Sequence, residues 1–184
     1  MMAMFKSRTF NREIKPGANL VGAKLSGRNL AGVDLSSAQI SSSQMSGANL
    51  CGAHLMDADL TLSDLRNANL SDANLCACKL EGALLNGANL TGANLLGADL
   101  RGANLMGADL HRASLTDARA GMASFCGAQL QNASLRNADL RSCNFSDANL
   151  TGADISGALL DAAYFSCTTM PDGSISHPDG NGLD

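Results

Sequence analysis

The side chains best suited to metal binding or acid-base chemistry are few in this 184-residue chain, and they stand far apart. The histidines are His54, His111 and His177, and none has a cysteine pair or a carboxylate cluster at the spacing of metal ligands. Cys76 and Cys78 form Cys-x-Cys without the second cluster that a zinc site needs. No Ser-His-Asp arrangement is apparent either. We therefore expect no metal, no cofactor and no catalytic residue, and we predict that the protein is not an enzyme.

Glycine and charge exclude further classes of protein. Glycine recurs at five-residue intervals, but no Gly-Lys-Ser or Gly-Lys-Thr follows it, as a phosphate-binding loop would require. The net charge is -4, whereas a nucleic-acid binder needs a basic face, so no direct nucleic-acid binding is expected. The sequence contains no apolar run long enough for a signal peptide or a membrane span. We expect a soluble cytoplasmic protein that does not bind a membrane.

The elements that carry these side chains follow from a strict period of five residues. Every fifth residue from Leu20 to Phe165 is apolar, and the residue two positions before it is small, nearly always alanine. Between these two stands a residue that is usually Asn or Asp. A period of five fits neither an α-helix nor an ordinary strand, and so strict a repeat indicates a solenoid.

Each pentapeptide predicts a short extended stroke followed by a corner. The fifth-position residue and the small residue point inward, the residue between them points outward, and the two that follow have the composition of a turn. Four strokes then close a square coil, and stacked coils pair at about 4.8 Å. The sequence predicts an uninterrupted β-solenoid of about 7–8 coils of 20 residues.

The blocks ANLVG, AKLSG, ANLTG, ADLRG and ANLMG resemble the pentapeptide-repeat family, with its motif A(N/D)LxG. The resemblance covers residues 16 to 165, and it implies an all-β fold, the right-handed quadrilateral parallel β-helix. The handedness follows from the resemblance alone. The segment MPDGSI resembles the tail of some cyanobacterial members, including a regulator of heterocyst differentiation.

The chain divides into three predicted segments: residues 1–15 as an irregular N-terminal cap, 16–165 as the pentapeptide-repeat β-helix, and 166–184 as a C-terminal cap and mobile tail. Arg28 occupies a small inward position, and Arg8 precedes it by one coil. Two arginines cannot share an apolar core, so we expect an irregular, open first coil. We expect three apolar residues to plug that end: Phe5, Phe10 and Ile14.

One inward position is underfilled. Ala120 stands where leucine is the rule, and Gly121 and Met122 follow it. We expect either Phe125 at the next central position, or Met122 turning inward, to fill this layer of the core.

The outward residues, read at intervals of 20, give columns on each face. One column alternates in sign: Asp59, Lys79, Asp99, Arg119 and Asp139. Vertical neighbours at about 4.8 Å would form exposed ion pairs, either to fix the register or to recognise a partner. A second column is rich in amides, from Asn29 to Asn149, and favours a structural ladder. Three outward residues form an apolar strip: Met56, Cys76 and Leu96. The charged column and the apolar strip together are the possible partner surface.

The six cysteines are predicted to be free thiols, because no two of them lie one coil apart. The function that we favour is a non-enzymatic scaffold, a rigid rod that presents side-chain ladders to an unidentified protein partner. One alternative, implied by the resemblance, is a DNA-mimicking modulator of DNA gyrase of the quinolone-resistance type, although the sign alternation speaks against an acidic mimic. Another is a regulator in cyanobacterial physiology or cell differentiation. The rod is expected to be a monomer or an end-to-end dimer.

Overall fold

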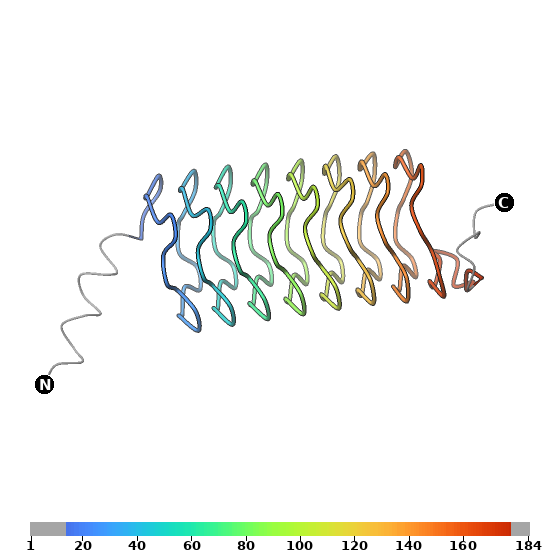
Figure 1. The fold of residues 1–184 in the computed structure, drawn as a ribbon, viewed down its shortest axis with the longest axis horizontal. Helices are drawn as coiled ribbons and strands as arrows, with labels where there is room; N and C mark the ends of the chain where they lie inside the picture. Colours follow the sequence, from blue (N-terminus) through green and yellow to red (C-terminus); the bar gives the residue numbers. More distant parts are fainter. Residues whose placement is uncertain (1–13, 178–184) are drawn as a thin grey trace, which may run out of the picture.

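The computed structural model describes residues 14–177, which form a rod of stacked coils (Figure 1). The described residues contain no helix and no continuous strand; their pairing consists of single-residue bridges at every fifth position. Parallel bridges join residues that lie 20 apart, from Asn19–Gln39 to Asn149–Thr169. The predicted coil of 20 residues is therefore confirmed, and with it the all-β solenoid.

Two backbone hydrogen bonds join each stroke to its neighbours in the adjacent coil. The N–H of Leu50 donates to the carbonyl of Asn69 at 2.6 Å, and the N–H of Asn69 donates to the carbonyl of Ala48 at 2.9 Å. The same pattern recurs along the rod, so the inward and outward residues of every stroke are held in register. This pairing satisfies backbone groups that burial would otherwise leave unpartnered.

The corner after each stroke is a tight turn. The N–H of Ala53 donates to the carbonyl of Leu50 at 3.0 Å, and Gly52 between them has φ 62°. This left-handed conformation favours glycine at the second corner position. Leu62 adopts φ 57° at the same place in its own pentapeptide, where its side chain points away from the coil.

The interior of the rod consists of the predicted leucine and alanine columns. Leu90 and Ala88 are fully buried, as are their equivalents through the middle coils. Near the C-terminal end three phenylalanines replace leucine in one column and stack with nearly parallel rings. The ring centroids of Phe125 and Phe145 are 4.9 Å apart, and those of Phe145 and Phe165 are 5.2 Å apart.

The residue expected to compensate for Ala120, Phe125, is completely buried, as is Ala120 itself. The alternative, that Met122 turns inward, is wrong, because its side chain is 77% exposed. Met122 stands at the second corner position with φ 65°, where the side chain points away from the core.

Polar residues at small inward positions are tolerated because each donates a hydrogen bond, to a carbonyl of the adjacent coil in most cases and, for Ser43, to the hydroxyl of Ser63 at 3.3 Å. Ser63 Oγ donates to the carbonyl of Ile40 at 2.9 Å, and Cys78 Sγ to that of Leu55 at 2.7 Å. Burial raises the pKa of the Cys78 thiol to about 12, and that of Cys143 to about 12 as well. These two thiols are structural parts of the core.

The expectation of an irregular, open first coil is wrong for the coil that contains Arg28, where the backbone is regular and pairs in register. Ile14, one of the expected plug residues, is partly buried and packs against the core. Arg28 donates from its N–H to the carbonyl of Leu25 at 3.0 Å and accepts from Asn49 at 2.8 Å, while its side chain is exposed. The predicted plug residues Phe5 and Phe10, together with Arg8, lie outside the described residues.

The pentapeptide geometry continues one step past Phe165 at the C-terminal end. Thr169 pairs in parallel with Asn149, and Met170 is buried at the next central position. Thr169 then pairs antiparallel with Ile175, which folds the chain back over the last coil. The rest of the predicted tail, residues 178–184, lies outside the described residues. Within residues 14–177 there is no helix of the length and apolarity needed to cross a bilayer.

Candidate functional surfaces

The outward Asn and Asp residues have a structural role in the corners. The side-chain oxygen of Asn89 accepts the N–H of Thr91 at 3.0 Å, and that of Asn94 accepts the N–H of Leu96 at 3.1 Å. Each such Asx turn provides an acceptor for the N–H of the first corner residue, which the hydrogen bonds between coils leave without a partner. The Asn or Asp of the repeat motif therefore belongs to the architecture, and it marks no site by itself.

The charged column, Asp59, Lys79, Asp99, Arg119 and Asp139, stands in the predicted vertical register. Its closest ion pairs, however, lie within single strokes that read Asp-Leu-Arg. Arg101 Nη2 is 2.7 Å from Asp99 Oδ2, and Arg141 Nη2 is 2.7 Å from Asp139 Oδ2. These hydrogen bonds hold the pKa of both carboxyl groups below the usual value. The sequence prediction considered only vertical neighbours and missed this motif.

Vertical ion pairs occur as well, at longer distances. Arg119 Nη1 lies 3.5 Å from Asp99 Oδ2, and Arg101 Nη2 lies 3.0 Å from Glu81 Oε2. Lys79 makes no ion pair within the described part of the chain. The pKa of Asp59 is lowered mainly by a hydrogen bond from Thr61, with a smaller contribution from Lys79. The column is thus a mixture of pairs within and between coils.

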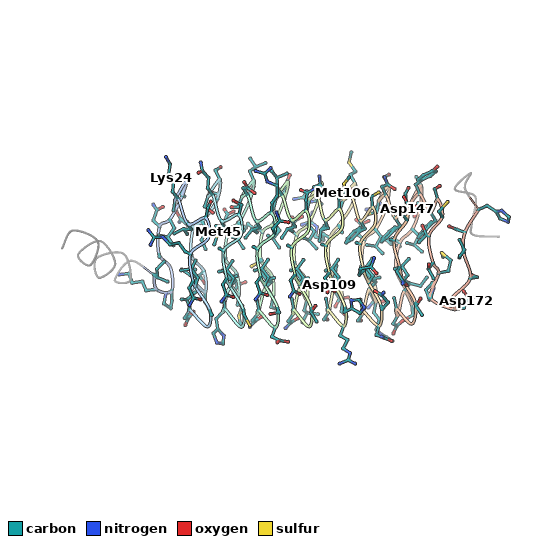
Figure 2. The ribbon with its side chains drawn as sticks, turned by 90° about the horizontal axis from the view of Figure 1, so that it is seen from below. Lys24, Met45, Met106, Asp109, Asp147 and Asp172 are labelled. Atoms are coloured by element: carbon teal, nitrogen blue, oxygen red, sulfur yellow. The ribbon has the colours of Figure 1, made fainter. Side chains whose placement is uncertain are left out.

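The apolar strip lies along the corner that precedes the charged column. The side chains of Met56 and Leu96 are 43% and 39% exposed, and Cys76 between them is partly exposed. Each strip residue stands three positions before a member of the charged column, so the strip and the column form one continuous surface over three coils. Another exposed apolar side chain, Met106, projects from the rod on a different corner (Figure 2).

The amide column contains only a short ladder. Asn49 Nδ2 donates to Asn29 Oδ1 at 3.0 Å, and Asn69 Nδ2 donates to Asn49 Oδ1 at 3.2 Å. Farther along, Asp109 instead lies 2.7 Å from Nδ1 of His111. Its pKa is lowered because hydrogen bonds from His111 outweigh the opposing effect of burial. Among residues 14–177, no three His, Cys, Asp or Glu side chains cluster as metal ligands.

Comparisons with known proteins agree with this geometry. The family model described as "Pentapeptide repeats" matches in eight copies, over overlapping segments from residue 18 to residue 171. No curated protein matches the chain significantly.

Three solved structures are similar. HetL, a pentapeptide repeat protein involved in heterocyst differentiation regulation from the cyanobacterium Nostoc sp. Strain PCC 7120, is 31% identical; the match covers 95% of this chain and 99% of HetL, with a TM-score of 0.39. A second pentapeptide repeat protein from Nostoc is 34% identical over 54% of this chain and 80% of its own, with a TM-score of 0.46. QnrB1, a plasmid-mediated fluoroquinolone resistance protein, is 21% identical over 81% of this chain and 82% of its own, with a TM-score of 0.38.

Proposed function

This chain belongs to the pentapeptide-repeat family, whose members form right-handed quadrilateral β-helices, and on that basis we propose that it is a non-enzymatic scaffold for a protein partner. The interior is filled by buried apolar side chains through the middle coils, which leaves the outward columns to carry the function. A rod of regular coils holds those columns at fixed spacing. The six cysteines are all free, as is usual for proteins of the reducing cytoplasm. A cytoplasmic location is therefore part of the proposal.

The observation that carries the proposal is the continuous surface made by the apolar strip and the charged column. Half-exposed Met56 and Leu96 offer apolar area in vertical register. The neighbouring column offers exposed charges of both signs, such as Arg119. An apolar centre beside a polar, charged margin is the usual anatomy of a protein interface.

Photo-crosslinking tests this surface directly. A photoreactive label on Cys76 of a variant whose other exposed cysteines are replaced by serine should capture one protein in a lysate of the source organism. Leu96→Glu should abolish that capture. Met106→Glu, which changes an exposed methionine on another corner, should leave the capture intact. Equal capture by both variants would refute the assignment of this surface.

The gyrase alternative is tested with purified enzyme. The charged column contains arginine and lysine between its aspartates, so it lacks the continuous negative strip of a DNA mimic. We expect no effect of the protein on gyrase-catalysed supercoiling. Inhibition of supercoiling at stoichiometric protein would favour the gyrase alternative over the scaffold.

A further inference from the structure

The N-terminal end of the rod carries a row of backbone N–H groups that no described residue accepts. From the second coil onward, the N–H of each outward residue donates to a carbonyl 21 positions earlier, as Asn49 donates to Arg28 at 2.8 Å. Three equivalent N–H groups of the first coil have no acceptor within residues 14–177: those of Lys24, Asn29 and Asp34. Such a row is the open edge of a sheet, and it can pair with a further strand.

A groove of about 430 Å³ opens beside this edge, and most of its lining is apolar: Ile14, Pro16, Leu30, Ala31 and Val33. Val33 is only partly buried, whereas Ala93, at the same position of a middle coil, is completely buried. The two charged residues of the lining, Lys15 and Asp34, are of opposite sign. An apolar side chain therefore suits this groove better than an ion does.

The sequence that precedes the described residues keeps the phase of the repeat. Phe10 stands 20 residues before Leu30, which lines the groove, and Phe5 stands 20 residues before Leu25. Central positions accept a phenylalanine, since Phe125 is completely buried in the column of Leu25. The period of the coil therefore assigns Phe10 to the layer next to Leu30.

The residues around Phe10 have equivalents in the rod. Arg12 stands at the second corner position, which Arg112 occupies with φ 56°. Arg8 stands at a small inward position, as Arg28 does, and Arg28 has an exposed side chain in a regular coil. Two exposed guanidinium groups one coil apart repel only weakly in water. The period is interrupted at Lys15, so one irregular step joins residues 8–12 to the rod.

The opposite end of the rod is covered by the chain's own terminal segment. Thr169 pairs antiparallel with Ile175, and the N–H of Ser176 donates to the carbonyl of Thr168 at 2.9 Å. At the N-terminal end, a single residue separates position 12 from Ile14, which lines the groove. A strand tethered in this way has a high effective concentration at the edge, which favours it over a separate chain.

We propose that residues 8–12 of the same chain add a strand to the N-terminal edge, with the ring of Phe10 in the groove against Leu30. The N–H of Asn29 donates to the carbonyl of Arg8, and the N–H of Phe10 donates to the carbonyl of Asn29. These pairs repeat the hydrogen bonds between residues 21 and 19 positions apart along the rod. The added strand closes this edge to a second copy of the chain. The inference is independent of the proposed function.

Native-state hydrogen exchange of the full chain, followed by ¹⁵N-edited NMR, tests this pairing. We expect slow exchange of the Asn29 amide in the wild type, and NOEs between the ring of Phe10 and the methyl groups of Leu30. Phe10→Ser should accelerate exchange at Asn29 about tenfold or more, because the burial of a ring is lost. The amide of Leu30, which donates to the carbonyl of Asn49 at 2.7 Å, reports whether the coil itself remains folded.

Two further variants separate the docked strand from a general loss of stability. Thr9→Ala changes the neighbour of Phe10 that points outward in this register, so exchange at Asn29 should stay slow. Phe10→Leu, which restores the usual central residue, should keep exchange at Asn29 slower than Phe10→Ser does. The proposal is overturned by fast exchange at Asn29 in the wild type, or by equal effects of Thr9→Ala and Phe10→Ser. NOEs between Phe10 and Leu30 of different molecules, in a mixture of labelled and unlabelled protein, would also overturn it and assign the edge to a second copy.

Discussion

Replacing the middle ring of the phenylalanine stack, Phe145→Leu, tests how the coils are held together. Phe145 is buried and stacks on Phe125 at 4.9 Å and on Phe165 at 5.2 Å. Leucine fits this column, since Leu65, Leu85 and Leu105 occupy the same inward position in the three coils before Phe125. The loss is therefore dominated by two ring contacts, each worth about 0.5–1.5 kcal/mol beyond area burial. We expect the free energy of unfolding to fall by about 1–3 kcal/mol.

The graded comparison uses Phe165→Leu, which removes one ring contact instead of two. Its expected cost is about half, roughly 0.5–1.5 kcal/mol. Urea denaturation followed by far-UV circular dichroism measures both, and the double variant Phe145→Leu/Phe165→Leu then gives the coupling energy of that stacked pair. If Phe145→Leu cost no more than Phe165→Leu, the stacking account of this column would be refuted.

Three further outcomes follow from the same structure. Leu90→Arg should prevent folding, because it buries an unpaired charge in a full layer; a variant with unchanged stability in urea would contradict the inward assignment. The pKa values of Asp99 and Asp139 are lowered by their arginines, so their contribution is present above the unfolded pKa of about 3.9 and is lost as the pH falls through the folded values. Acid titration of the Asp99→Asn/Asp139→Asn variant should show a smaller loss of stability below pH 4 than the wild type, and an equal loss would argue against these pairs. Cys78 and Cys143 should react with a thiol reagent only after unfolding, while the other four cysteines react in the native protein; labelling of all six at once would contradict the burial.

The inside of the rod could be predicted from the sequence almost completely, because a period of five with two apolar positions allows one arrangement. Leu90 and Ala88 are buried where the period places them. The choice between Phe125 and Met122 at the underfilled layer could not be made, since it depends on the left-handed backbone at Met122. That conformation directs the side chain outward, whatever its hydrophobicity.

The outward surface was harder to predict, because column spacing says which residues are stacked but not how far a side chain reaches. Arg101 stands at a corner, where the chain has already turned, and its long side chain folds back onto Asp99 in the same stroke. The Asp-Leu-Arg pattern was visible in the sequence and would have indicated this pair.

The stacked phenylalanines also bear on how the chain finds its register during folding. Coils with nearly identical leucine interiors can pair one coil out of step with little loss of contact, because a shift of 20 residues places leucine on leucine. Such a shift near the C-terminal end would instead set Phe125 against Phe165 or a ring against leucine, and would break both ring pairs. The three rings therefore distinguish the last coils from the rest and mark which neighbour each of them should join.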